Sequence, residues 1–190
     1  VTAAGCGAAL KEYGHLLKDD TSYAVRAEAF TDRVVDVSEL LGSGDLAQPS
    51  DDVKLEVTYQ EPCHLAHAQR ITQQPRNILN AIPGLELNEM RESSLCCGSA
   101  GIYNIIRREM ADDLGDRKAE AIRDTGVKTV ITANPGCHMQ LRTSLRRNEV
   151  DTEVLHIAQV LDRAYGGRES AERGDWAFRR TSNGQPSPDA

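Results

Sequence analysis

The chain has 190 residues, of which 39% are hydrophobic and 27% are charged, and its formal net charge is −7. This composition is typical of a soluble globular domain, and the negative charge argues against nucleic-acid binding, which needs a basic surface. No apolar run approaches the roughly 20 residues of a membrane span, and no signal-peptide pattern opens the sequence. We therefore expect a cytoplasmic protein, with any membrane association peripheral, at the inner face.

The part of the chain before residue 53 predicts short helices. Residues 1–5 are typical of a strand end that runs into a glycine turn, and a helix is expected over residues 8–17. Further helices are expected over residues 22–31 and 34–41. Residues 42–52 are rich in Gly, Ser, Asp and Pro, so they are predicted to be a linker.

From residue 53 onward, strands alternate with helices. Val53, Leu55, Val57 and Tyr59 alternate with polar residues and predict a strand, and the apolar residues 127–132 predict a strand that is buried on both faces. The other expected elements are a helical stretch over 63–82 broken at Pro75, a strand over 85–90, helices over 102–114 and 115–124 (closed by Gly126) and 134–147, a strand over 154–157 and a helix over 158–165. This order predicts an α/β fold with a mainly parallel sheet flanked by helices. The polar residues 166–190 predict a disordered tail, in which Trp176 and Phe178 are the residues able to dock.

The cysteines carry the strongest functional signal. The chain has five of them, Cys6, Cys63, Cys96, Cys97 and Cys137. An odd count without a secretion signal does not indicate a disulfide framework, and clustered cysteines in a reducing compartment more often bind metal or do redox work. The last four follow predicted strands, and ligands bind at the carboxyl ends of strands in open α/β sheets. We therefore expect Cys63, Cys96, Cys97 and Cys137 to converge on one metal site.

The type of metal group follows from the cysteine pattern. Four thiolates suit zinc or an iron–sulfur cluster. The adjacent Cys96 and Cys97 are awkward ligands for one tetrahedral zinc, whereas a cluster offers several iron atoms. Gly98, Gly101 and Gly136 allow the backbone to approach a bulky group closely. The sequence therefore favours a cluster, with zinc as the alternative.

Other residues near the cysteines have less specific readings. His64, His67 and His138 are alternative ligands or hydrogen-bond donors to ligands, although lone histidines are more often structural, as we expect of His15 and His156. Glu61 and Glu92 could tune a redox potential, but they are expected to be solvated. Two rival functions remain, a thiol–disulfide catalyst that uses the adjacent pair with Cys63, and a plain domain with buried free cysteines. Adjacent cysteines form strained disulfides and no Cys-x-x-Cys motif is present, which argues against the first.

Three segments resemble the cysteine-rich CCG domain family. They are Pro62-Cys63-His64-Leu65, Glu92-Ser-Ser-Leu-Cys-Cys-Gly98 and Asn134-Pro135-Gly136-Cys137. Residues 4–8, 11–17 and 99–104 are similar to glycolate-oxidase-type iron–sulfur subunits of that family. The resemblance implies that residues 53–165 are a complete second CCG domain, that residues 1–41 end a first one, and that the chain is a C-terminal fragment. Cys6 would then be the last cysteine of the truncated domain, unligated here.

The resemblance also implies a function and a set of ligands. It implies an oxidoreductase subunit that transfers electrons in a flavin-dependent glycolate or 2-hydroxy-acid dehydrogenase complex, with FAD in partner subunits, towards a quinone or another acceptor. A flavin takes two electrons and clusters pass them singly. Cys63, Cys96, Cys97 and Cys137 would hold a [4Fe–4S] cluster, and no residue of this chain would be catalytic. A missing ferredoxin-like domain would be a further partner, and a zinc-stabilised scaffold in the same kind of complex is the alternative.

One position departs from the fullest form of the family motif. That form ends in Cys-x-x-Cys, as in heterodisulfide reductase, but Gln140 occupies the second position here. The resemblance therefore implies four thiolates, enough for a [4Fe–4S] cube but not for a five-thiolate site.

Overall fold

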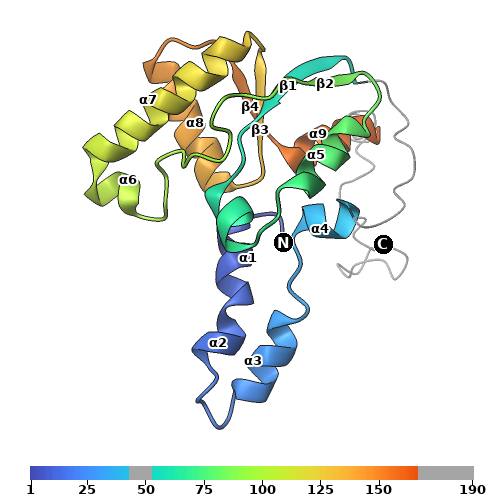
Figure 1. The fold of residues 1–190 in the computed structure, drawn as a ribbon, viewed down its shortest axis with the longest axis vertical. Helices are drawn as coiled ribbons and strands as arrows, with labels where there is room; N and C mark the ends of the chain where they lie inside the picture. Colours follow the sequence, from blue (N-terminus) through green and yellow to red (C-terminus); the bar gives the residue numbers. More distant parts are fainter. Residues whose placement is uncertain (43–52, 167–190) are drawn as a thin grey trace, which may run out of the picture.

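A four-stranded parallel sheet forms the centre of the protein, whose computed structural model describes residues 1–42 and 53–166 (Figure 1). The strands are β1 (Leu55–Tyr59), β2 (Leu85–Leu87), β3 (Thr129–Thr132) and β4 (Glu153–His156), in the spatial order β2-β1-β3-β4. Tyr59 of β1 pairs with Ile131 of β3, which in turn pairs with Leu155 of β4. The predicted α/β fold with a mainly parallel sheet is confirmed.

Helices cover both faces of this sheet. Those that follow the strands are η1 (His64–Ala68, a π-helix), α5 (Gln73–Asn80), α6 (Tyr103–Ile106), α7 (Arg108–Thr125), α8 (Pro135–Arg147) and α9 (Ile157–Ala164). Val57, Ile131 and Leu155 pack on one face against η1, α5 and α9, whereas Val130 and Val154 pack on the other face against α7 and α8. β3 is buried along its whole length because it lies between these two layers, as parallel strands usually do.

Four short helices precede the sheet. They are α1 (Ala4–Lys11), α2 (Tyr13–Leu16), α3 (Ala24–Thr31) and α4 (Val37–Gly42). α2 and α3 form a hairpin that projects away from the sheet (Figure 1), with the rings of Tyr13 and Phe30 5.8 Å apart. The strand expected over residues 1–5 is wrong, because α1 already begins at Ala4, whose amide donates to the carbonyl of Ala133 beyond β3.

Two predicted helix breaks fall at different residues in the structure. α5 runs through Pro75, which lies in its first turn, where a missing N–H costs no helical hydrogen bond. The chain breaks earlier, near Arg70, which has a φ of +58°. α7 likewise runs through Gly115. The glycine serves close packing there, because a side chain at this position would overlap the Ser144 hydroxyl of α8. The helix break falls at Arg107 instead. Both predictions were wrong because Pro75 and Gly115 were taken as helix breakers without regard to their surroundings. Pro75 lies in a first helical turn, and Gly115 packs against α8.

Two parts of the predicted organisation lie almost wholly outside the described residues. They are the linker over 42–52 and the tail over 166–190 with Trp176 and Phe178, so both stay predictions, as does the division into a truncated and a complete CCG domain. Within the described residues, no helix combines the length and the apolar composition that crossing a membrane requires.

Candidate metal centre

The structure brings the four predicted ligand cysteines to one cavity of about 350 Å³ at the carboxyl edge of the sheet. Cys63 follows β1, Cys96 and Cys97 lie in the loop after β2, and Cys137 lies in the first turn of α8, after β3. The sulfurs of Cys63 and Cys96 are 4.0 Å apart, and the thiol of Cys97 contacts those of Cys96 and Cys137. Cys97 and Cys137 are buried, and the other two are half-buried.

The end of β1 fixes the position of Cys63. The side chain of Gln60 accepts a hydrogen bond from the Thr132 hydroxyl of β3 (2.8 Å) and donates to the carbonyl of Glu61 (2.7 Å). Cys63 is the residue that precedes the π-helix η1. π-helices are rare and often occur at functional sites, because the wider turn redirects side chains. The thiol of Cys63 is therefore directed by a β-strand end and by an uncommon helix.

The loop that carries Cys96 and Cys97 is tied to the sheet and to α7. The amide of Glu61 donates to the carbonyl of Ser93 (3.1 Å), and the Lys118 ammonium donates to the carbonyls of Glu92 (2.5 Å) and Ser93 (3.2 Å). The amide of Gly98, which has a φ of +92°, donates to the sulfur of Cys96 (3.4 Å). This conformation favours glycine, and it aims a backbone donor at a thiol.

Asn134 links Cys137 to the start of the chain. Its side-chain oxygen accepts from the amide of Gly5 (3.1 Å), and its side-chain nitrogen donates to the sulfur of Cys137 (3.4 Å). Pro135 is the first residue of the 13-residue helix α8, and Cys137 follows two positions later. A thiolate in this first turn is also stabilised by the positive end of the helix dipole.

The four thiols share protons along a row. The hydrogen bond between Cys63 and Cys96 raises the pKa of Cys63 and lowers that of Cys96, and the hydrogen bond between Cys97 and Cys137 raises the pKa of Cys97 and lowers that of Cys137. Neighbouring sulfurs therefore alternate between hydrogen-bond donor and acceptor. Full deprotonation of all four requires a positively charged group in the cavity, and binding such a group releases the remaining protons.

Lys118 is a site residue that the sequence analysis missed. Its side chain is 1% exposed, and burial lowers its pKa to about 8, against the opposing attraction of Cys97, Glu92, Cys96 and Cys137. The signal was present, because Lys118 falls on the buried face of α7 beside Ala119 and Ile122. A lysine on the apolar face of an amphipathic helix marks a position where a buried charge has partners.

Glu61 and Glu92 are both neutralised by arginines. The expectation that Glu61 is solvated is wrong, because Glu61 is only 5% exposed. Its carboxylate lies 2.9 Å from the guanidinium of Arg76, which also pairs with Glu89 (2.5 Å). Glu92 is exposed and pairs with Arg117. Arg76 thus joins α5 to the end of β1, next to the segment that leads to Cys63.

Replacing Arg76 by methionine is expected to destabilise the protein by about 3 kcal/mol, because it leaves the buried carboxylate of Glu61 without its cation. Urea unfolding of the metal-free protein measures the loss. Arg91→Met is the matched control, since Arg91 pairs with exposed Glu120 and Asp124 and its loss should leave the free energy of unfolding nearly unchanged. Adding Glu61→Gln to Arg76→Met should recover part of the stability, and no recovery would contradict the buried-charge explanation.

The histidines lie at different distances from the cavity. His64 lines it, with Nδ1 3.6 Å from the Cys63 sulfur, whereas His67 lies exposed on η1. His138 forms a hydrogen bond with the carbonyl of Val154 (3.0 Å), and His156 caps α9 by accepting from the amide of Ala158 (3.1 Å). Of the histidines proposed as alternative ligands, His64 is thus the one placed beside the thiols.

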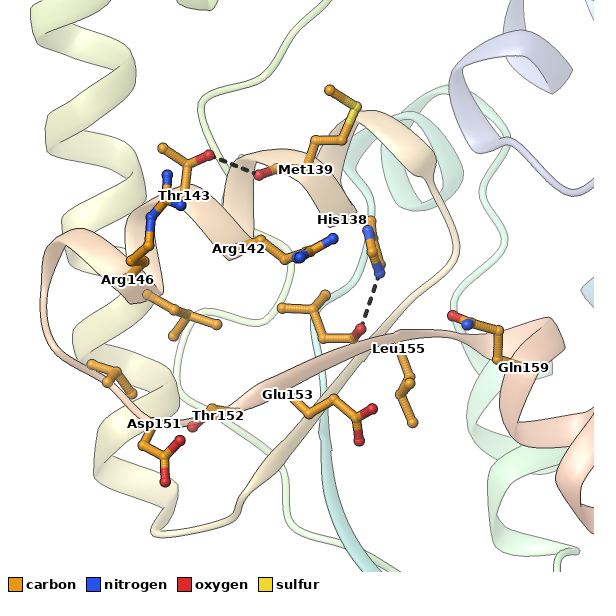
Figure 2. A pocket seen from close by; sticks show the side chains of 13 residues that line it. His138, Met139, Arg142, Thr143, Arg146, Asp151, Thr152, Glu153, Leu155 and Gln159 are labelled. Carbon is orange, nitrogen blue, oxygen red and sulfur yellow. Dashed lines mark hydrogen bonds between the residues drawn. The ribbon is translucent and has the colours of Figure 1, made fainter.

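A larger open groove of about 790 Å³ lies between α8 and β4. Figure 2 shows His138, Arg142 and Arg146 extending from α8 along this groove, with Glu153 and Leu155 on β4. Its lining is mostly polar and charged and contains none of the cysteines. The smaller cavity is therefore the candidate site, because the chemistry rather than the volume distinguishes it.

The residues around the smaller cavity fit a group that contains several metal atoms. Among the described residues, no three Cys, His, Asp or Glu side chains are arranged to hold a metal ion as they stand. The four sulfurs instead line a cavity, and a cluster offers each thiolate its own iron atom. Gly136 lies on the cavity wall, where an added Cβ would be 2.9 Å from the Ser99 hydroxyl oxygen. Soft thiolates, backbone amides and close glycines form a donor set suited to an iron–sulfur group.

Fold and site together define an α/β domain that gathers cysteines at the carboxyl edge of a parallel sheet. Residues 57–142 match the family described as a cysteine-rich domain, CCG, and this part of the chain belongs to that family. The fold is also similar to the crystal structure of a hypothetical protein from Helicobacter pylori, with a TM-score of 0.59, 13% identity, and coverage of 85% of this chain and 33% of that one.

Three curated relatives are similar over most of the chain. The probable glycolate oxidase iron-sulfur subunit of Bacillus subtilis is 41% identical over 88% of this chain, and the glycolate oxidase iron-sulfur subunit of Escherichia coli is 34% identical over 86%. A fumarate reductase (CoM/CoB) subunit of Methanothermobacter marburgensis is 41% identical over 85%. The chain spans 39%, 39% and 31% of these relatives, respectively. The predicted resemblance to glycolate-oxidase-type iron–sulfur subunits is confirmed.

Proposed function

We propose that this chain is an electron-transfer module of an oxidoreductase complex and that Cys63, Cys96, Cys97 and Cys137 hold a [4Fe–4S] cluster. The observation that carries the proposal is the convergence of these four thiols on one cavity. The relatives named as iron-sulfur subunits support the identity of the group. When bound, such a cluster supplies reversible one-electron transfer.

The residues of this chain would hold the cluster and set its surroundings. The amide of Gly98 and the side chain of Asn134 donate to two of the sulfurs, which reduces the charge that the thiolates place on the cluster. The Lys118 ammonium adds a positive charge within the protein, and the burial of Cys97 and Cys137 keeps water from that side. These features suit a one-electron carrier, and we assign no catalytic residue to the chain.

The proposed partners follow from this role. A flavin-containing subunit with FAD would oxidise glycolate or another 2-hydroxy acid and deliver electrons to this chain, which would pass them towards a quinone or another acceptor. This division of roles between a flavin subunit and a cluster subunit is chemically sound, because a flavin collects two electrons and a cluster passes them singly. The names of the relatives support a dehydrogenase-type complex.

Metal analysis of anaerobically purified protein tests the proposal. We expect about four irons and four sulfides per chain and a brown colour that dithionite bleaches, as for a [4Fe–4S] centre. About one zinc per chain without colour would overturn the cluster and favour a zinc-stabilised scaffold of the same kind of complex. Colourless, metal-free protein with reactive thiols would instead favour thiol–disulfide chemistry.

Replacing Lys118 by methionine is expected to lower the midpoint potential of the bound cluster. A positive charge near the cluster stabilises the reduced state, which carries one more negative charge, so its removal favours the oxidised state. A redox titration followed by electron paramagnetic resonance measures the shift. Lys128→Met is the control, because Lys128 is exposed and pairs with Asp151 at the surface. An unchanged or higher potential in the Lys118 variant would contradict this role.

A further inference from the structure

The groove between α8 and β4 is a second cavity, which the proposed electron-transfer role does not use. Its volume of about 790 Å³ lies within the range of small-molecule sites, roughly 300–1,000 Å³. β4 is an outermost strand of the sheet, so the groove runs along the open side of the sheet and not along its carboxyl edge. A ligand bound there would be separate from the group held by the cysteines.

One wall of the groove carries two arginines that have no counterion. His138, Arg142 and Arg146 follow one another at intervals of four residues on α8, which places them on one face of the helix. In Figure 2 the Arg142 side chain extends from α8 towards His138. Among the described residues, neither Arg142 nor Arg146 forms an ion pair. The neighbouring Arg147, in contrast, is bound by two carboxylates of α7.

The carboxylates that line the groove are paired with other cations. Asp151 lies 3.6 Å from the ammonium of Lys128, and Glu153 lies 3.6 Å from the guanidinium of Arg163. Neither of these two cations belongs to the lining of the groove. The two arginines of α8 therefore give the groove a local excess of positive charge, although the chain as a whole has a net charge of −7. Such a local excess attracts anions.

The stability of α8 does not account for this arrangement. Like charges four residues apart on a helix repel each other and destabilise it. Arg146 lies in the last turn, where the helix dipole favours a positive charge, but Arg142 lies before that turn and gains nothing from the dipole. Both arginines are exposed, so neither is needed to fill the core. Their shared position on the groove wall is better explained by a ligand.

We propose that this groove binds the phosphate group of an organic phosphate, with Arg142 and Arg146 as its charged ligands. The fork of a guanidinium matches two phosphate oxygens, and two guanidiniums balance the roughly two negative charges of a phosphate monoester at neutral pH. The Cβ atoms of residues one helical turn apart are about 5–6 Å from each other, so two long, flexible arginines can reach one phosphate. The rest of the groove, which includes Val150 and Leu155, leaves room for the organic part of the ligand.

Titration of the anaerobically purified full chain with phenyl phosphate, followed by calorimetry, tests the proposal. We expect binding that the double variant Arg142→Gln/Arg146→Gln weakens at least about tenfold, because it removes two charge-assisted contacts. The double variant Arg33→Gln/Arg107→Gln is the matched control, since it removes the same charge from two exposed arginines outside the groove. Its affinity should be unchanged, and an equal loss in both variants would overturn the proposal.

A second assay separates a soluble phosphate from a lipid headgroup. The chain is sedimented with phosphatidylcholine vesicles that contain phosphatidic acid, whose headgroup is a phosphate monoester. Binding of phenyl phosphate that depends on Arg142 and Arg146 assigns the groove to a soluble organic phosphate, whereas binding to the vesicles alone, with the same dependence, assigns it to a lipid. Binding in neither assay would overturn the proposal. The iron content of the groove variant should not change, because the groove contains none of the proposed cluster ligands.

Discussion

Alanine in place of Cys97 is expected to abolish loading of the cluster, with iron per chain falling at least about tenfold. Cys97 contacts the thiols of both Cys96 and Cys137, so its removal interrupts the row of sulfurs in the middle. Cys97 is only 1% exposed, so its sulfur lies on the buried side of the cavity. Loss of a buried ligand weakens metal binding more than loss of a ligand at the rim of the cavity, because water cannot take the place of the buried sulfur.

Iron and sulfide analysis of the anaerobically purified variant measures this effect. Met139→Ala is the control on α8, since Met139 is 70% exposed and its loss should leave the iron content unchanged. In the metal-free state, Cys97→Ala should cost only about 1 kcal/mol in the free energy of unfolding, the value for a small apolar group removed from the core. A Cys97→Ala variant that keeps its metal would support the plain reading of the cysteines as buried packing residues.

The pattern of the strands carried the most reliable information in the sequence. Val57 and Tyr59 alternate with polar residues, and Val130 and Ile131 lie in a short segment rich in β-branched residues, so residue pattern and segment length both indicated strands. Because parallel strands share one carboxyl edge, placing Cys63 and Cys137 after two such strands was enough to bring them together. The edge of the sheet, rather than any local motif, made the site predictable.

The supporting contacts of the site were not predictable in the same way. Lys118 and Arg76 bind groups that lie far away in the sequence, namely the carbonyls of residues 92 and 93 and the carboxylate of Glu61. Their partners are set by the approach of α7 and α5 to the sheet, which periodicity does not specify. The assignment of Cys6 to a truncated preceding domain stays a prediction, and its place in the lining of this cavity depends on contacts of Ala4 and Gly5 that periodicity does not specify either.

Replacing Gly98 by alanine is expected to destabilise the protein by about 3 kcal/mol or more and to release the loop that carries Cys96 and Cys97. Gly98 has a φ of +92°, and an added Cβ would overlap the carbonyl oxygen of Ala111 in α7. The variant would therefore suffer both an unfavourable backbone conformation and a collision with helical backbone, which cannot move as a flexible side chain can. Relief requires the loop to move away from α7, and this movement would displace the amide that donates to Cys96.

Gly101→Ala in the same loop is the matched control. Gly101 also has a positive φ, +65°, but its added Cβ would meet no atom within 4 Å. Its replacement should cost only the backbone term, about 1 kcal/mol, and the chain should keep its metal. Urea unfolding and metal analysis of the two variants separate strain from collision. Equal losses would mean that positive φ alone makes these glycines necessary, whereas a larger loss at Gly98 would show that the cysteine loop depends on close backbone contact with α7.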